Sequence, residues 1–594
     1  MAIALKNFKP NDLVKNIRRS LLLLWQTSSS LALLTLSLHI IQALLPVASL
    51  YFIKILVEGV TNKQAFSEIV PFIIYFLVTQ LLLALTQQYA NYIITIYQPR
   101  LTDYLSKQVL EKAVSVDYGY YENPAYHDNL HLAQQQSLYR AGMLLTSFTA
   151  FITSGFALLF LLLFFISMQS FFALFFIAFS LPLAAIKWYY GIAIMQQERK
   201  LAPLERESNY LHQILTGVTF AKETRVFSFG SFFIDKFVNI RRSIRLQKQR
   251  LNKKLTHYSL IAEAIEIIAM AIIFAILSRQ TIEGAVTLGL FVVYIQGFQN
   301  LQHNSKNFLQ SIVQIFQQRI FLQDLFLFLD IPLSQKTSNH NPFPLTDSGL
   351  TVEKLNFRYT PDSKLVLRDI SLQCKPGQII AIVGQNGSGK STLIKLLAKL
   401  YEANEGQIYF DNTAIEEISE KSYKEQTVFL FQDFEKYFFT IEENIILGEP
   451  DATKTIDKIQ SAAHAAGAEG LISKLPEGYQ TRMGRIFEGS AQLSGGEWQK
   501  IALARVFYRD NAQLIVLDEP TSALDAPAEY EIFKQIKAIA KDKMVILITH
   551  RLYNLKIADH LYVMENGRIA EEGSFDELIE KNGVFAQLYN MQQL

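Results

Sequence analysis

Cysteine is nearly absent from this chain, because Cys374 is the only one among 594 residues. A single thiol cannot form an intramolecular disulfide, and a cysteine-ligated metal site needs more than one. We therefore expect Cys374 to act as a small apolar side chain. Glycine and proline are also scarce, with 27 and 16 residues. Their scarcity and the high apolar fraction exclude a collagen-like or disordered chain.

Charged residues are scarce as well, and their distribution divides the chain in two. They make up 19% of the residues, against 50% hydrophobic residues and a mean hydropathy of +0.16, which argues against an ordinary soluble enzyme. The net charge of +2 gives no reason to expect a nucleic-acid partner. Residues 21–53 contain no charged side chain, whereas charges recur every few positions beyond residue 350. The first part therefore resembles a membrane domain and the second a soluble one.

The uncharged runs predict six membrane crossings. A helix rises 1.5 Å per residue, so about 20 apolar residues span the hydrocarbon of a bilayer. The run 141–186 has 46 residues and must cross twice, with a turn at 167–170. The predicted spans are residues 21–53, 69–98, 141–166, 171–190, 258–278 and 284–305.

Lysine and arginine predict the orientation of these spans, because positive residues stay cytoplasmic. Residues 188–255 contain 13 of them, whereas the three short turns together contain only Lys63 and Arg279. We expect both termini and the long connections to be cytoplasmic, in a bacterial cell membrane. The long connections predict helical hairpins. A break at 122–124 and another near residue 217 should each leave a short helix at the tip, at about 124–136 and 218–228, that docks onto a soluble domain.

The stretch 331–349 is rich in Pro, Ser and Asn and has no periodicity, so we predict an interdomain linker there. The predicted domains are residues 1–330, spanning the membrane, and residues 350–594, which are soluble.

A phosphate-binding loop follows the strand-like sequence QIIAIV and precedes a helical pattern. Its glycines let backbone N–H groups wrap phosphate oxygens at a helix N-terminus. We expect Lys390 to reach the β- and γ-phosphates and Ser391 to ligate Mg²⁺. The loop comprises Gly384, Gln385, Asn386, Gly387, Ser388, Gly389, Lys390, Ser391 and Thr392.

A second apolar strand, residues 514–517, ends in Asp518 and Glu519. Asp518 suits the water shell of a phosphate-bound Mg²⁺, and Glu519 suits polarising the attacking water. An ordinary strand end is the alternative interpretation of this pair.

The segment between these two motifs carries the sequence LSGGE, and here the chain resembles the ABC transporter family. The signature residues are Leu493, Ser494, Gly495, Gly496 and Glu497. The other motifs of the family appear along the chain in the order expected of the family. Tyr359 resembles the aromatic residue that stacks on adenine, Gln432 the Q-loop glutamine that ligates Mg²⁺, and His550 the switch histidine. The D-loop corresponds to Ser522, Ala523, Leu524 and Asp525.

The resemblance implies an exporter-type half-transporter. Its fold would be an all-α six-helix transmembrane domain followed by an α/β P-loop domain with a small antiparallel β subdomain and a helical subdomain. ATP and Mg²⁺ would bind where the signature of one copy covers the phosphate loop of another. Glu519 and His550 would be catalytic. Because every motif is intact, a homodimer is the simplest assembly, and a heterodimer with another half-transporter is the alternative.

The signature ends in Glu497 where glutamine is usual, a near-isosteric change that we expect to preserve activity. Together with TRMGRIFEGSAQ before it, the signature region resembles lantibiotic exporters that lack a protease domain. About 20 residues precede the first span, so we expect no fused leader peptidase.

The transported substrate is less constrained. Glu263 and Glu266 share one face of the fifth span. They either favour cationic substrates in a cavity or pair with basic groups such as Lys187. A peptide or amphipathic compound is the leading cargo. The alternatives are a lipid or lipid-linked glycan flippase and an ATP-dependent sensor without cargo.

Overall fold

The computed structural model describes residues 10–122, 124–168, 172–332, 341–344, 349–450 and 453–593. The chain forms two units, one of Met1–Val116 with Asn123–Pro332 and one of Asp117–Glu122 with Leu333–Leu594. Most of the predicted linker 331–349, and Gln169 and Ser170 of the predicted turn, lie outside the described residues.

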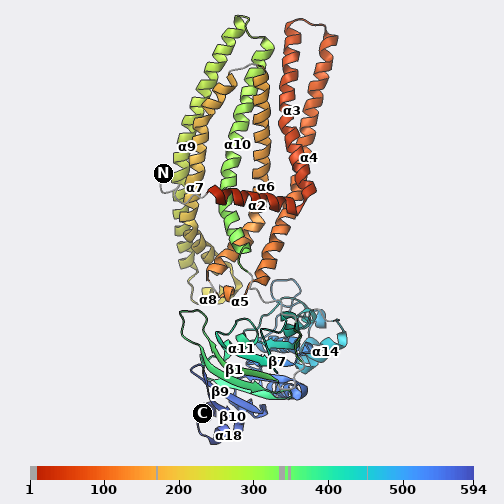
Figure 1. Cartoon of the computed structure of the whole chain (residues 1–594), viewed down its shortest axis with the longest axis vertical. Coiled ribbons are helices and arrows are strands. Elements are labelled where there is room, and N and C mark those ends of the chain that lie inside the picture. Colours follow the sequence, from red (N-terminus) through yellow and green to blue (C-terminus); the bar gives the residue numbers. More distant parts are fainter. Residues whose placement is uncertain are drawn as a thin grey trace. The chain divides into compact units, whose positions relative to one another are not determined.

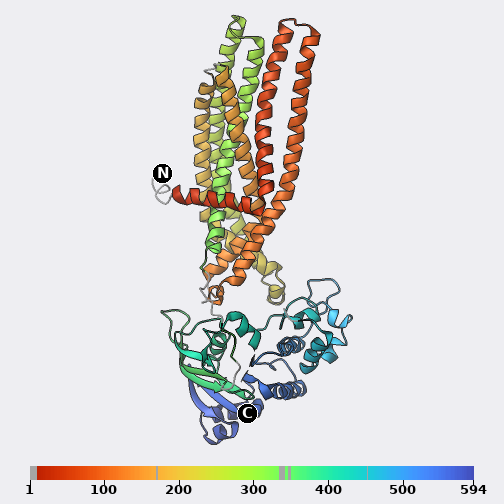
Figure 2. The same cartoon turned by 45° about the vertical axis from the view of Figure 1, so that its right-hand side comes forward.

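The first unit is helical throughout its described part, and it contains six helices longer than 30 residues (Figure 1). They are α3 (Ser29–Thr61), α4 (Phe66–Ser115), α6 (Pro124–Ser167), α7 (Phe172–Thr216), α9 (Gly230–Ile282) and α10 (Leu288–Leu329). A shorter helix, α2 (Pro10–Thr27), runs across the long helices rather than along them (Figures 1 and 2).

Capping side chains fix where two of these helices begin. The hydroxyl of Ser28 accepts a hydrogen bond from the Leu31 N–H at the start of α3, and Thr287 accepts one from Leu290 at the start of α10. Among the described residues, α3, α4, α9 and the Gly142–Ser167 part of α6 are long and apolar enough to cross a membrane. Few side chains in these apolar segments are buried within the chain, as expected of helices that face lipid.

Helix α10 lies at the centre of the first unit, where it contacts α3, α6 and α7. Its sequence is less apolar than those of α3 and α6, with Gln296, Gln299 and Asn300 along its length. Polar side chains within a membrane bundle are expected to face other helices, which can share hydrogen bonds with them. The central position of α10 thus accounts for these three polar side chains.

An aromatic cluster packs α10 against α6. Phe165 stacks on Phe298 with ring centroids 5.5 Å apart, and Tyr294 stacks on Phe165 at 5.9 Å. Phe165 and Phe298 are fully buried. Gly297 lies against the Phe165 ring and lets the two helices approach closely.

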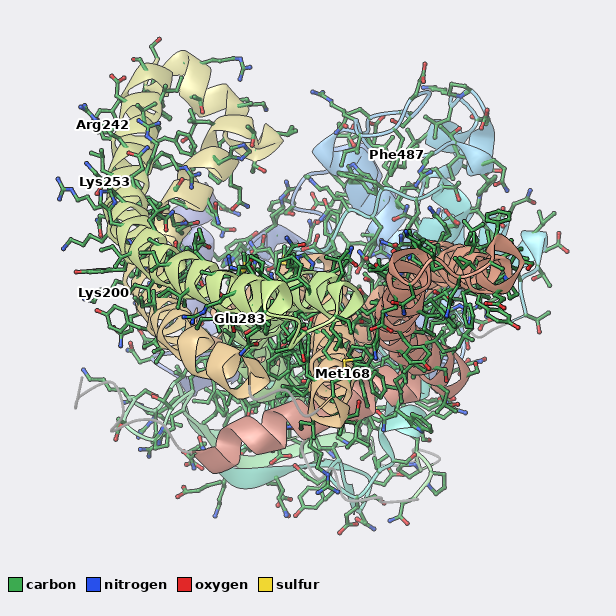
Figure 3. The ribbon with its side chains drawn as sticks, turned by 90° about the horizontal axis from the view of Figure 1, so that it is seen from above. Met168, Lys200, Arg242, Lys253, Glu283 and Phe487 are labelled. Carbon is green, nitrogen blue, oxygen red and sulfur yellow. The ribbon has the colours of Figure 1, made fainter. Side chains whose placement is uncertain are left out.

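The two ends of the bundle differ in structure. Met168 and Glu283, at the ends of α6 and α9, lie at one end (Figure 3). The opposite end carries the 3₁₀ turn Val218–Phe220 and the short helix α8 (Ala221–Val226) (Figure 1). Exposed Lys200, Arg242 and Lys253 lie along the α7–α9 pair (Figure 3).

The first predicted tip needs a correction. Residues 124–136 do not form a separate short helix, because Pro124 opens the long helix α6. Proline favours the first turn of a helix, where its missing N–H costs nothing. The short helix is α5 (Tyr118–Tyr121), which precedes Pro124 and belongs with the second unit.

The second unit is built on two sheets. The four-stranded sheet has the order β2-β1-β4-β5 and is antiparallel. The six-stranded sheet has the order β10-β9-β3-β8-β7-β6 and is parallel except for β10. The strands are β1 (Leu350–Phe357), β2 (Leu367–Cys374), β3 (Ile379–Gly384), β4 (Glu405–Phe410), β5 (Thr413–Ala414), β6 (Thr427–Leu430), β7 (Leu514–Asp518), β8 (Met544–Ile548), β9 (His560–Glu565) and β10 (Arg568–Gly573).

Helices cover the parallel sheet, and every residue of β7 and β8 is buried. The segment between β6 and β7 is a helical subdomain that lies to one side of the sheets (Figure 2). The helices are α11 (Lys390–Leu397), α12 (Glu420–Gln426), α13 (Ile441–Ile446), α14 (Ile456–Ala465), α15 (Glu469–Ile472), α16 (Gly495–Tyr508), α17 (Ala526–Ile539), α18 (Phe575–Glu580) and α19 (Val584–Gln593). The predicted fold class is therefore confirmed.

The close approach at Gly297 predicts a stability effect. A Cβ atom at this position would lie 2.3 Å from Cζ of the buried Phe165 ring. We expect Gly297→Ala to destabilise the fold by about 1–3 kcal/mol, because a well-packed interface has no room for the methyl group. Thermal unfolding of the purified protein measures this, with Gly230→Ala as control, where the added Cβ makes only ordinary contact at 3.7 Å. Equal melting temperatures of the two variants would contradict the packing argument.

Candidate nucleotide-binding and hydrolysis site

The candidate site lies where three neighbouring parallel strands end. β3, β8 and β7 are adjacent, and Ile382 pairs with Ile548, which also pairs with Asp518. The phosphate loop follows β3, His550 follows β8, and Asp518 ends β7 with Glu519 directly after it. Carboxyl ends of parallel strands meet at one edge of a sheet, where ligands of such folds bind.

The phosphate loop connects β3 to α11 as its sequence predicted. Gly384, Gly387 and Gly389 have positive φ angles of 152°, 81° and 108°. A Cβ at Gly384 would lie 2.2 Å from the Met564 carbonyl oxygen, so no other residue fits there. Residues 385–387 are exposed at the tip of the loop, which leaves their backbone N–H groups accessible to a phosphate.

The Lys390 side chain folds back over the loop. Its Nζ donates hydrogen bonds to the carbonyl oxygens of Gly384 at 2.9 Å and Gln385 at 3.0 Å. Burial lowers the pKa of the Lys390 ammonium, although the charges of Asp518 and Glu519 act in the opposite direction. The cation thus lies between the loop and both carboxylates, where it can bind phosphate oxygens.

Two carboxylates and an imidazole face this loop. Burial, and then the charge of Glu519, raise the pKa of Asp518 to about 6. Oε1 of Glu519 lies 3.0 Å from Nε2 of His550, whose side chain is much more exposed than that of Glu519. A carboxylate paired with an imidazole at the open edge of a site can take a proton from a water molecule.

The backbone of Glu519 is in the left-handed region, with φ of 50°. For a residue other than glycine this conformation costs on the order of 1 kcal/mol and must be held by its surroundings. The Glu519 N–H donates to the Ile548 carbonyl at 2.8 Å, and the Glu519 carbonyl accepts from Nε2 of Gln499 at 2.8 Å. These two bonds aim the carboxylate at the edge of the sheet.

Gln499 was missed by the sequence analysis. It is buried in α16, and its Oε1 also accepts a hydrogen bond from the Ala523 N–H at 2.8 Å. Gln499 thereby joins the helix that follows the predicted signature to the predicted D-loop through a hydrogen bond. A polar residue on an otherwise apolar helix face was the only signal in the sequence.

The signature residues cap α16. The N–H of Ser494 donates to Oε2 of Glu497 at 2.7 Å, and the Ser494 hydroxyl accepts from the Glu497 N–H at 3.4 Å. The backbone and side-chain hydrogen bonds of Ser494 lower the pKa of Glu497. Gly496 packs on the D-loop, since its Cβ would lie 2.5 Å from the Ala523 carbonyl, whereas the space around Gly495 is open.

Tyr359 and Gln432 differ in how the structure joins them to the loop. The Tyr359 hydroxyl lies 2.9 Å from Oγ1 of Thr392, and the residue is 38% exposed, so a flat ligand can stack on its ring. Gln432 is exposed after β6, and no hydrogen bond between described residues joins it to the other site residues.

The residues at this edge also fit Mg²⁺. The hydroxyl of Ser391 and the carboxylate of Asp518 are hard oxygen ligands, which this ion prefers. Among the described residues no group of three or more His, Cys, Asp or Glu side chains could hold a metal ion alone. An ion held partly by the phosphates of a nucleotide is consistent with so few protein ligands.

Comparison with known proteins decides the family. Residues 367–522 match the model of the ABC transporter family. The chain is 31% identical to the subtilin transport ATP-binding protein of Bacillus subtilis over 575 residues, which cover 96% of this chain and 92% of that protein. The chain belongs to the ABC transporter family. It is therefore an ATP-hydrolysing membrane transporter.

Two further proteins resemble this ABC transporter along its whole length. The nisin transport ATP-binding protein of Lactococcus lactis subsp. lactis is 28% identical over 604 residues, covering 97% of this chain and 96% of that protein. The solved structure of a bacterial Atm1-family ABC exporter with ATP bound has a TM-score of 0.76 at 20% identity, covering 98% and 99% of the two chains. The likeness to that structure establishes an exporter fold.

A buried carboxylate joins the segment that carries His550 to the segment after β7, and sequence reasoning missed it. Glu529 in α17 is 2% exposed. Its carboxylate accepts hydrogen bonds from Thr521 and Arg551, each at 2.6 Å, and from Tyr553 at 3.1 Å. Arg551 also donates to the Ser522 carbonyl at 3.2 Å. Glu529 thereby ties the D-loop to the segment that carries His550.

In the membrane unit, Glu263 and Glu266 share one partner. Nζ of Lys306 on α10 lies 3.3 Å from the Glu263 carboxylate and 3.9 Å from that of Glu266. The side chain of Lys187 is outside those described. Neither oxygen of the buried Glu266 accepts a hydrogen bond from the described residues. Glu263 lines a cavity of about 390 Å³ between α7, α9 and α10.

The arrangement at β7 predicts that Glu519→Gln abolishes ATP turnover while ATP binding persists. An amide cannot accept the proton of the attacking water, whereas the phosphate loop is unchanged. Steady-state hydrolysis and equilibrium ATP binding measure the two effects. Near-normal hydrolysis by Glu519→Gln would reject Glu519 as the base.

The buried network predicts that Glu529→Gln lowers the free energy of unfolding of the second unit by about 2–4 kcal/mol, since it removes a buried charge that Arg551 pairs with. We also expect kcat to fall about tenfold, because the loop carrying His550 loses its anchor. Thermal unfolding and ATPase kinetics check both. Glu531→Gln is the control, because Glu531 is exposed on the same helix. Equal effects of the two substitutions would contradict the role of Glu529.

Proposed function

We propose that this ABC transporter is a homodimeric exporter of a peptide or a similar amphipathic compound. The observation that supports the cargo is the whole-length similarity to two proteins named for the transport of subtilin and nisin. An exporter fold supports the direction of transport.

In the proposed homodimer, the phosphates held at Gly384–Thr392 of one copy are covered by Ser494–Gly496 of the other. The open space around Gly495 leaves room for a phosphate of the partner site. The N-terminus of α16 would stabilise the γ-phosphate through its N–H groups and its dipole. ATP bound in this way joins the two second units, and hydrolysis releases them.

Hydrolysis would proceed by attack of water on the γ-phosphorus. Glu519 would accept a proton from the water while the water oxygen bonds to the γ-phosphorus. The bond between the γ-phosphorus and the β–γ bridging oxygen would break, and that oxygen would leave with ADP. His550, 3.0 Å from Glu519, would contact the γ-phosphate. Bound Mg²⁺, held at Ser391, Gln432 and, through water, Asp518, would neutralise charge on the β- and γ-phosphates.

The proposed orientation places both termini and the second unit in the cytoplasm. The 13 lysines and arginines of residues 188–255 support it. The tip at 218–228 presents exposed apolar side chains, with Val218, Val226 and Phe227 each at least 70% exposed. A cytoplasmic apolar tip needs a protein surface to cover it, which supports docking on a partner subunit.

The cavity lined by Glu263 favours a cationic group on the cargo. Two carboxylates share one lysine, so the cluster has one more acidic than basic side chain. Charges within membrane spans are expensive and are associated with transported or buried partners. An ammonium group of a peptide would compensate the remaining carboxylate.

The proposal is tested with the protein reconstituted in proteoliposomes. Cationic amphipathic peptides are expected to stimulate ATP hydrolysis and to accumulate inside vesicles whose ATP-binding units face outward. Stimulation by lipids or lipid-linked glycans alone would instead favour a flippase. ATP binding without any stimulation of ATP hydrolysis and without uptake of peptide would favour a sensor.

The cavity predicts that Glu263→Gln lowers the apparent affinity for a cationic peptide about three- to tenfold, because one charge of the cluster is lost. Peptide-stimulated ATPase measures it. Glu68→Gln, at an exposed position on α4, is the control. Unchanged stimulation by every active peptide in both Glu263→Gln and Glu266→Gln would exclude this selectivity.

A further inference from the structure

Residues Asp117–Glu122 belong with the nucleotide-binding unit, although α4 and α6 on either side of them belong to the membrane unit. The segment contains the short helix α5. A segment that joins two membrane helices therefore forms part of the packing of the second unit. The segment contacts Lys395 and Tyr401, and Lys395 is on the helix that begins at the phosphate loop.

An ion pair anchors this segment. Nζ of Lys395 lies 2.6 Å from Oε1 of Glu122, where the Lys395 side chain is partly buried and the Glu122 side chain is exposed. Although partial burial alone would raise the pKa of the Glu122 carboxyl, the hydrogen bonds and charge around it, chiefly those of Lys395, lower it. The pair is thus ionised at neutral pH.

Three tyrosines surround the same lysine. Its Nζ lies 5.6 Å from the ring centroids of Tyr118 and Tyr359 and 5.9 Å from that of Tyr401. Tyr401 makes edge contacts with Tyr118 at 5.8 Å and with Tyr359 at 5.3 Å. Cation–π contacts at these distances are attractive. Lys395 and Tyr401 therefore connect Tyr118 of the segment to Tyr359.

Helix α11 carries three residues that take part in this connection or lie beside it. Its first residue is Lys390 of the phosphate loop, Thr392 bonds the Tyr359 hydroxyl at 2.9 Å, and Lys395 binds Glu122. One short helix thus contacts the proposed phosphate site, the proposed adenine-stacking ring and the segment between α4 and α6.

We propose that Glu122, acting through Lys395, positions the Tyr359 ring and so sets the affinity of the site for the adenine base of ATP. Glu122 and Lys395 are positioning residues, and the inference rests on the proposed nucleotide site. Because coupling between two equilibria is reciprocal, displacement of the Asp117–Glu122 segment would weaken ATP binding, and bound ATP would retain the segment.

Charge reversal in the full-length protein in lipid nanodiscs tests the inference. We expect Glu122→Lys and Lys395→Glu each to weaken ATP binding about three- to tenfold, and the double reversal to restore it to within about twofold. Inorganic tripolyphosphate, which lacks the base, should bind all these variants equally well. The KM for ATP should rise while kcat is unchanged. Lys421→Glu, which breaks an exposed pair with Glu425, is the control.

Two results would overturn the inference. One is ATP affinity unchanged in both single variants, and the other is an equal loss for ATP and tripolyphosphate, which indicates a general structural defect. Where a reversed variant fails to fold, Glu122→Gln gives the same test, with a smaller loss for ATP alone. Lys390→Ala separates the two proposals, because retained binding of both ligands by that variant would reject the nucleotide site itself.

Discussion

The register of β3, β8 and β7 is the constraint on which the chemistry of this ABC transporter depends. Ile548 pairs with both Ile382 and Asp518, so β8 and β7 end two residues before β3 does, and the loops that follow the three strands lie at one edge of the sheet. The strands are buried and cannot slip without exposing their apolar side chains. This register fixes the positions of the phosphate loop, the Asp518–Glu519 pair and His550. The strained backbone of Glu519 is held by hydrogen bonds to the Ile548 carbonyl and from the Gln499 side chain.

The membrane unit obeys a different constraint, because polar groups there must face protein or water rather than lipid. Helix α10, which carries polar side chains among its apolar ones, is accordingly central, and its Lys306 is the partner of Glu263 and Glu266. Close packing at Gly297 and the aromatic stack around Phe165 hold α10 against α6. The resulting bundle has its apolar surface on α3, α4, α6 and α9 and its charged cluster against α10.

Much of this could be predicted from the sequence, because the patterns are local. Uncharged runs predicted long membrane helices, and the phosphate loop carries its own strand, glycines and helix. The predicted position of the first tip was wrong, because proline occurs in the first turn of a helix as well as at helix breaks. Pro124 opens the long helix α6. Glu529, Gln499, Lys395 and Lys306 were missed since their importance comes from partners distant in sequence, such as Arg551 and Glu122. No local pattern identifies such pairs.

The central claim is that each ATP site is shared between two copies of the chain, and mixed dimers test it most directly. One copy carries Lys390→Ala and the other Gly495→Asp, a change that its own surroundings accommodate. Each variant alone should be inactive. In the mixed dimer one site combines the intact phosphate loop of the second copy with the intact signature of the first. The account predicts that ATP hydrolysis returns, up to about half of the native rate for one site of two. Mixed dimers as inactive as either parent would contradict it.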